Sequence, residues 1–177
     1  MTTSTKQFLS GLALTASILL LVASCSKSDT SPQAQVLKRE GEPDFVRVDD
    51  DKQMDAAVAK ARKSISEFIA ALQTPAATDR NFSVKKPFKV ADGEEHIWLV
   101  NVNFDGKNFH GEVGNEPVDV KNIKLGEKVT VSKSEASDWM FVRNGKLMGG
   151  YTVRALYDRS SPEEKKELLK HVDFKLD

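Results

Sequence analysis

The stretch of sequence that decides the fold is DKQMDAAVAKARKSISEFIAALQTP, residues 51–75. Its apolar side chains recur at spacings of three and four residues, so they line one face of an α-helix of about five turns. These side chains are Met54, Ala57, Val58, Ala61, Ile65, Phe68, Ile69 and Leu72. The acidic residues 49–51 favour a helix start, and Pro75 favours a stop because the residue before a proline avoids helical geometry. The stretch predicts one long amphipathic helix that needs a second layer to cover its apolar face.

After residue 81 the apolar period becomes two, which is typical of strands. The predicted strands are 82–84, 95–104, 108–113, 117–123, 129–131, 139–142 and 146–148. Asp105-Gly106 and Asn144-Gly145 favour tight hairpin turns between neighbouring strands. The sequence therefore predicts an antiparallel sheet.

The segment 95–104 is partly apolar on both faces, which predicts a central strand between two layers. Ile97 and Leu99 share one face. The other face carries mainly His96, Trp98, Val100 and Val102.

Shorter elements flank this sheet. Residues 45–48 predict a first strand, and residues 151–157 favour a short helix. Ser161-Pro162-Glu163-Glu164 predicts a capped helix start, and the alternation in 171–177 predicts a final edge strand. The fold class is α+β: a twisted antiparallel sheet, either open or partly barrel-like, with the long amphipathic helix packed on it and short C-terminal helices.

Residues 1–24 have the features of an export signal. Lys6 precedes a mostly apolar run, 8–22, which is shorter than the roughly 20 residues that a spanning helix needs. The run ends in Val22-Ala23-Ser24-Cys25, which resembles the bacterial lipoprotein box, and Cys25 is the one cysteine of the chain. We expect Cys25 to carry lipid and to anchor an exported protein on the periplasmic side of a membrane. The alternative is an ordinary cleaved signal with a coincidental cysteine. Ser26 favours the outer membrane if the cell is Gram-negative.

This predicts three parts: a lipoprotein signal peptide, 1–24; a lipidated cysteine with a flexible tether, 25–44; and a single domain, 45–177. The chain has 26 basic and 26 acidic residues, and the signal removes only one charge, that of Lys6. A neutral domain has no field to attract nucleic acid from a distance, so nucleic-acid binding is not expected.

The candidate chemistry is sparse. The histidines, His96, His110 and His171, lie far apart without metal-ligand spacing, so neither a metal site nor a cofactor is predicted. Gly149 and Gly150 fit turns better than a phosphate loop.

The sequence contains the residue types of a hydrolytic triad: Asp138, His96 and one of Ser132, Ser134 or Ser137. The chain has no Gly-x-Ser-x-Gly elbow to expose a serine, and an enzyme is not favoured.

A recognition pocket is the better hypothesis, because the chain offers flat apolar rings and a few directional polar groups. The candidate residues are His96, Trp98, Asp138, Trp139, Tyr151 and Arg154. The guanidinium of Arg154 can bind a carboxylate or phosphate with two hydrogen bonds, or form an ion pair within the domain.

Five motifs resemble the YegJ-like domain, a bacterial domain of unknown function. They are Lys85-Lys86-Pro87-Phe88, residues 92–98, residues 125–129, Ser137-Asp138-Trp139-Met140 and residues 144–154. The resemblance runs from about residue 51 to the C-terminus and implies a small bacterial domain, sometimes exported, without an established reaction. The strand-rich half is also similar, more distantly, to immunity-type domains that neutralise toxins.

Together these observations favour a non-catalytic binding module on a lipid anchor, whose partner is an envelope protein or a small ligand. The alternatives are an immunity-like toxin inhibitor and an envelope hydrolase.

Overall fold

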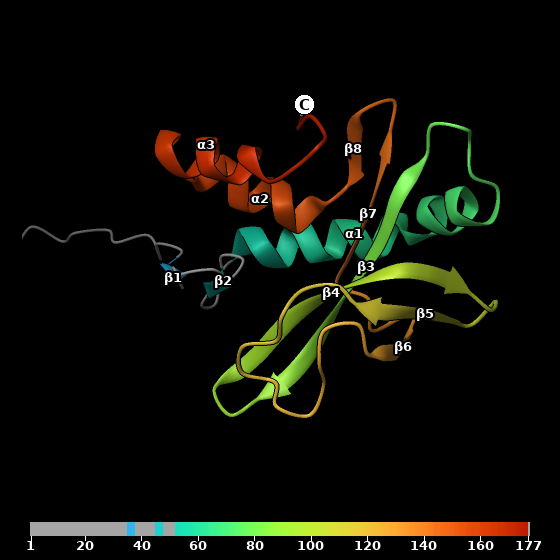
Figure 1. Cartoon of the computed structure of the whole chain (residues 1–177), viewed down its shortest axis with the longest axis horizontal. Coiled ribbons are helices and arrows are strands. Elements are labelled where there is room, and N and C mark those ends of the chain that lie inside the picture. The colour runs from blue at the N-terminus through green and yellow to red at the C-terminus, as the bar shows by residue number, and fades with distance from the viewer. Residues whose placement is uncertain (1–34, 38–44, 48–51, 177) are drawn as a thin grey trace, which may run out of the picture. The chain divides into compact units, whose positions relative to one another are not determined.

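The computed structural model describes residues 35–37, 45–47 and 52–176. The long helix α1, Lys52–Gln73, forms where the apolar stripe predicts it, and the chain then enters the strands (Figure 1). These are β3 (Arg80–Val90), β4 (Gly93–Phe104), β5 (Asn108–Val113), β6 (Lys128–Ser132), β7 (Asp138–Arg143) and β8 (Lys146–Gly149). The α+β class is confirmed.

The six strands form one sheet in the order β6-β5-β4-β3-β7-β8, and every neighbouring pair is antiparallel. The central position predicted for 95–104 is confirmed by β4. Within the described residues β6 and β8 do not pair with each other, so the sheet is open rather than closed into the barrel-like alternative.

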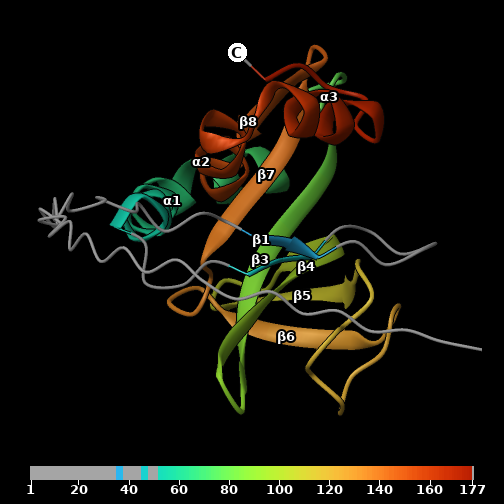
Figure 2. The same cartoon turned by 90° about the vertical axis from the view of Figure 1, so that its left-hand side faces the viewer.

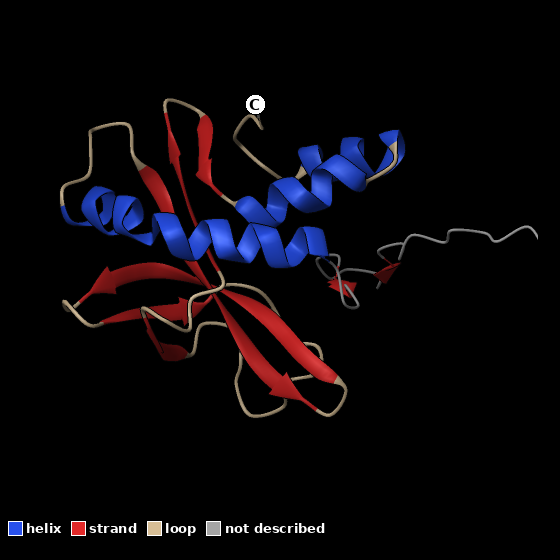
Figure 3. Cartoon of the chain, turned by 180° about the vertical axis from the view of Figure 1, so that it is seen from behind, coloured by secondary structure: helices blue, strands red, loops and turns tan. Residues whose placement is uncertain are grey.

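Helix α1 runs across one face of the sheet (Figures 1 and 3), and Phe68 lies at the centre of the contact. Its ring, which is fully buried, packs against the rings of Phe82, Phe109, Trp139 and Phe141 at centroid distances of 5.5–6.4 Å. A buried ring of this size contributes about 3–5 kcal/mol to stability. We call the α1 side of the sheet the inner face and the other side the outer face.

One residue of β4 was assigned to the wrong face. The strand register shifts between Val100 and Asn103, and Asn101 has a φ of 51°. This bulge adds one residue, and it turns Val102 into the core beside Leu99 instead of toward the face of His96.

The strand predicted at 117–123 is absent, and a loop takes its place. The main-chain N–H groups of Val118, Asp119 and Val120 donate to the carboxylate of Glu95 at 2.7–2.8 Å. Three successive donors aimed at one acceptor are incompatible with a strand, whose N–H groups alternate in direction.

After β8 the chain turns through Gly149 and Gly150, both at positive φ, into α2 (Tyr151–Arg159) and then α3 (Pro162–Lys170). Figure 2 shows both helices at the β7–β8 end of the sheet. The capping box predicted at Ser161 is present. The expected final strand at 171–177 is reduced to a single bridge between Lys175 and Lys146.

Two further short strands, β1 (Gln35–Leu37) and β2 (Phe45–Arg47), pair with each other. The strand expected at 45–48 corresponds to β2, whereas β1 falls within the stretch predicted as a tether. Residues 1–34, with Cys25 and the predicted signal, lie outside the described residues.

Candidate functional site

Asp138, at the start of β7, holds the beginning of α2. It is fully buried, and its carboxylate accepts four hydrogen bonds. The donors are the N–H groups of Trp139, Tyr151 and Thr152, at 2.8, 3.2 and 2.8 Å, and the Thr152 hydroxyl, at 2.6 Å. The N-cap residue of α2 is Gly150, which has no side chain to accept these bonds. Asp138 supplies the missing cap from a neighbouring strand and the negative charge that a helix N-terminus favours.

Lys85 on β3 connects this cap to the outer face. It pairs across the sheet with Trp98 on one side and Asp138 on the other. Its ammonium donates to the Thr152 hydroxyl at 2.8 Å and lies 4.6 Å from the centre of a Trp98 ring. The Thr152 hydroxyl therefore links the two charged groups, because it accepts from the Lys85 ammonium and donates to the Asp138 carboxylate.

Burial is the largest cause of the pKa shifts of both Lys85 and Asp138. It lowers the pKa of Lys85, against the attraction of Asp138. It raises the pKa of Asp138, against the charge of Lys85 and the hydrogen bonds from Thr152 and Trp139. The charged forms are stabilised against burial by their mutual attraction and, at Asp138, also by its hydrogen bonds.

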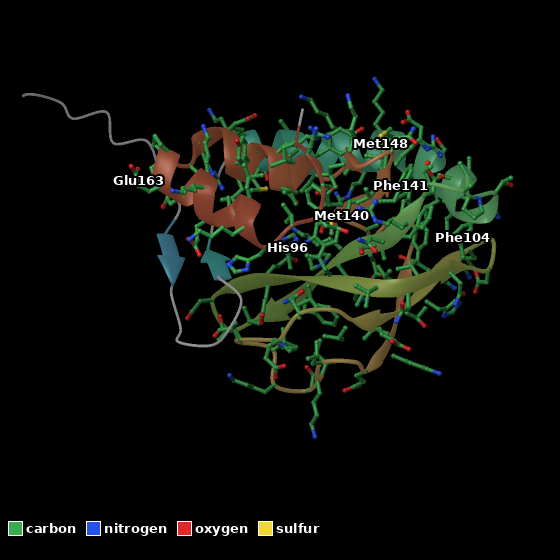
Figure 4. The ribbon with its side chains drawn as sticks, turned by 45° about the horizontal axis from the view of Figure 1, so that its top comes forward. His96, Phe104, Met140, Phe141, Met148 and Glu163 are labelled. Carbon is green, nitrogen blue, oxygen red and sulfur yellow. The ribbon has the colours of Figure 1, made fainter. Side chains whose placement is uncertain are left out.

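His96, on β4 (Figure 4), lies beside this network, and its side chain keeps contact with solvent. Its Nδ1 is 2.9 Å from Ser137 Oγ, its Nε2 is 3.9 Å from a Glu94 carboxylate oxygen, and its side chain is 38% exposed. Burial, reinforced by the positive charge of Lys85, lowers the pKa of His96, while Glu94 opposes the shift. The ring is therefore mainly neutral near pH 7.

The hydrolytic triad considered from the sequence is only partly present. Ser137 and His96 are in contact, but the Asp138 carboxylate is occupied by α2, and the acid nearest to the ring is Glu94. Ser137 itself is 1% exposed, and its hydroxyl also donates to the Lys85 carbonyl at 3.3 Å.

Trp139 and Tyr151 belong to the core side of the structure. The indole N–H of Trp139 donates to the Ala61 carbonyl at 3.0 Å. The Tyr151 hydroxyl accepts from Ser64 at 3.0 Å, and its ring packs edge-on against the Trp139 ring.

Arg154 binds the main chain of β8. Its guanidinium donates to the carbonyls of Leu147, at 2.6 Å, and Gly149, at 3.1 Å. Both of these acceptors are main-chain carbonyls, not acidic side chains. A Cβ at Gly149 would collide with the carbonyl and ring of Trp139, so this glycine is needed for close approach.

The six candidate residues therefore fall into two groups of three. His96, Trp98 and Asp138 converge around Lys85, whereas Trp139, Tyr151 and Arg154 hold α1, α2 and β8 together. Sequence reasoning missed Lys85 as the centre of the cluster, because its neighbours on both sides depend on two strand registers that no local pattern specifies.

Glu95 was also missed as a structural residue. It is 2% exposed and accepts the three N–H groups of the 118–120 loop. Its position between His96 and Glu94, on the face of Ile97, was a usable signal, because a carboxylate on an apolar strand face needs donors.

The described part of the chain contains no group of three or more His, Cys, Asp or Glu side chains arranged to hold a metal ion. None of its helices combines the length and apolar character needed to cross a membrane.

Comparison with known proteins gives a consistent family relationship. A family model described as "Uncharacterized protein conserved in bacteria (DUF2314)" matches residues 51–176. The chain is 36% identical over 119 residues to the uncharacterized protein YegJ of Escherichia coli K12, covering 67% of this chain and 76% of that protein. It is 42% identical over 89 residues to a putative ankyrin repeat protein of Neisseria meningitidis serogroup B, covering 48% of this chain and 35% of that protein. No solved structure matches the chain.

Proposed function

From the premise that this chain belongs to the bacterial DUF2314 family, as its YegJ-like motifs predicted, we propose that it is a lipid-anchored envelope protein that binds a partner without catalysis. The partner is an envelope protein or a small ligand, and the binding surface is the outer face around His96 and Trp98.

The observation that carries this proposal is that the Asp138 carboxylate caps the N-terminus of α2. This carboxylate is saturated by four donors and closed to solvent, so it can neither orient His96 nor activate a nucleophile. Trp139, Tyr151 and Arg154 are similarly engaged with the fold. What remains accessible is the partly exposed Trp98 indole, which lies beside the Lys85 ammonium, and the His96 imidazole two residues earlier on the same strand. Aromatic rings with polar neighbours are typical of binding surfaces.

The relative described as an ankyrin repeat protein supports a binding role. The aligned part is about a third of that protein, so related sequence occurs there as one piece of a longer chain. Stacked repeats of that class form extended binding surfaces, and a domain beside them is well placed to add a further contact.

The binding surface is tested by recovery of partners from envelope extract with the full chain as bait. We expect Trp98→Ala to lose a partner that the wild-type chain recovers, while Lys63→Ala, an exposed change on α1, keeps it. Identical partners for all three proteins, with circular dichroism showing each one folded, would remove the outer face from the proposal. A toxin among the partners would instead support the immunity-like alternative.

The anchor is tested separately, because Cys25 lies outside the described residues. We expect the wild-type chain to incorporate an alkyne analogue of palmitate and to be blocked in maturation by globomycin. Cys25→Ser should remove both effects and leave the protein unprocessed. Lipid labelling of the Cys25→Ser variant would contradict the anchor.

The hydrolase alternative depends on one contact, that between Ser137 and His96. A fluorophosphonate probe labels an activated serine covalently. Labelling of the wild-type chain that disappears in Ser137→Ala would favour the hydrolase over the binding module.

A further inference from the structure

The sheet divides between its two longest strands. β3 and β4 are paired from Val90 and Gly93 as far as Val84 and Leu99, and the register goes no further. Both strands nevertheless continue, β3 back to Arg80 along β7 and β4 onward to Phe104 along β5. Figures 1 and 3 show the two ribbons leaving each other at this point.

A left-handed asparagine lies in each strand where they separate. Asn81 has a φ of 58° and Asn101 a φ of 51°. The register between β3 and β7 shifts around Asn81, and the register between β4 and β5 shifts around Asn101. Such bulges bend a strand and end its pairing. Asparagine is one of the few residues with a Cβ that adopts the left-handed conformation, so the residue type at both bulges suits the separation.

At the separation lies a cavity of about 370 Å³ that is open to solvent. Its lining comes from both strands and from the end of α1: Leu72, Asn81, Phe82, Ser83, Val100, Asn101 and Val102. Leu72, Phe82 and Val102 pack against the hydrophobic core, whereas the two asparagines are exposed. The cavity is therefore apolar toward the inner face and polar toward solvent.

The two segments that border the cavity, 80–83 and 100–104, belong to strands that already use one edge for pairing with β7 and β5, and each is bent at its left-handed asparagine. Their other edges face each other across the opening. A strand edge presents alternating N–H and C=O groups, and the ligand that matches two such edges is another extended main chain.

We propose that this opening binds an extended peptide segment of a partner protein, which enters as an additional strand between β3 and β4. Main-chain hydrogen bonds hold the segment. Its alternate side chains are apolar and pack on Leu72, Phe82 and Val102. This site is distinct from the surface around Trp98, and it goes beyond the function proposed above.

The test uses the full chain in detergent and a fluorescent library of hexapeptides that alternate Thr with Val, Ile, Leu or Phe. We expect saturable binding by fluorescence polarisation, with amide exchange slowed in residues 80–83 and 100–104. The same library with N-methylated alternate amides should bind at least tenfold more weakly, because each methyl group removes a donor. No saturable binding, or binding of the methylated library within twofold, would overturn the proposal.

Matched variants locate the site. Leu72→Glu places a carboxylate at the cavity wall and should weaken binding at least tenfold. Gln73→Glu adds the same charge at the exposed neighbouring position and should leave binding unchanged. Trp98→Ala should bind the library like the wild-type chain. Unchanged binding by a folded Leu72→Glu variant, or a loss with Trp98→Ala, would overturn the assignment to this cavity.

Discussion

Asp138 and His96 come from different strands of the same sheet and border the same lysine, but the fold uses them differently. Asp138 is fully buried and accepts four hydrogen bonds, whereas His96 bonds to Ser137 and has a side chain that is 38% exposed. The difference arises from α2, whose N-terminus needs an acceptor that Gly150 lacks. A polar residue in a motif can therefore be a structural cap, and only the accessible member of the pair is available for binding.

The most severe test of this comparison is Asp138→Ala. The variant leaves the first N–H groups of α2 without their acceptor and Lys85 without its counter-charge. Breaking a buried charge pair in this way costs about 3–5 kcal/mol, so we expect a large drop in the free energy of unfolding by urea.

Asp92→Ala is the control for Asp138→Ala, because Asp92 is exposed in the β3–β4 turn. It should change stability by less than about 0.5 kcal/mol. If the two variants lose equal stability, Asp138 is not a cap of α2.

Glu95→Gln extends the comparison to the second buried carboxylate. The charge that accepts the N–H groups of Val118, Asp119 and Val120 is replaced by a neutral amide with a single acceptor oxygen. Hydrogen bonds to a charged group contribute about 1.5–3 kcal/mol each. We expect a loss of about 2–3 kcal/mol in urea unfolding, with faster amide exchange in residues 118–120.

The neighbouring Glu94→Gln makes the same chemical change at an exposed position of β4. It should leave both stability and exchange in the loop nearly unchanged. Loop exchange that is equally fast in both variants would show that Glu95 does not hold the loop.

Thr152→Val tests the link between the two charges. It removes the hydroxyl that accepts from Lys85 and donates to Asp138 while keeping the volume of the side chain. We expect a loss of about 1–2 kcal/mol, measured by urea unfolding against Thr74→Val, an exposed change after α1. A loss no larger than that of the control would mean that the hydroxyl does not link the pair.

The fold was largely predictable because its elements follow local patterns. The helical stripe of residues 54–72 predicts α1, and Asn144-Gly145, with φ values of 52° and 75°, forms the expected hairpin turn. The errors came from non-local partners. Glu95 withdraws three N–H groups from the strand predicted at 117–123, and the bulge at Asn101 moves Val102 to the other face. The place of Glu95 on an apolar strand face indicates that it needs donors, but nothing near it identifies the 118–120 loop as their source.

The candidate site was predictable only in part. His96, Trp98 and Asp138 do converge, but around Lys85, whose two cross-strand neighbours depend on strand order and register. Arg154 could not be assigned, because its acceptors are main-chain carbonyls that carry no sequence signature. Cys25 stays a prediction from the lipoprotein box alone.

His96→Gln gives the smallest expected effect and addresses the accessible member of the pair. The pKa of His96 is lowered from 6.5 in the folded protein, mainly by burial. The unfolded chain therefore binds more protons than the folded chain just below pH 6.5, and stability falls as the pH falls through this range.

Because the His96 ring is 38% exposed, solvent screening limits this effect to a few tenths of a kcal/mol. We expect His96→Gln to flatten the decline in unfolding free energy from about pH 7 to about pH 5. His171→Gln, at a side chain that is 76% exposed, should leave the decline as it is. An unchanged slope in His96→Gln would mean that the ring is solvated like an unfolded histidine. The contrast with Asp138 would then be complete, since one residue would belong wholly to the fold and the other wholly to the surface.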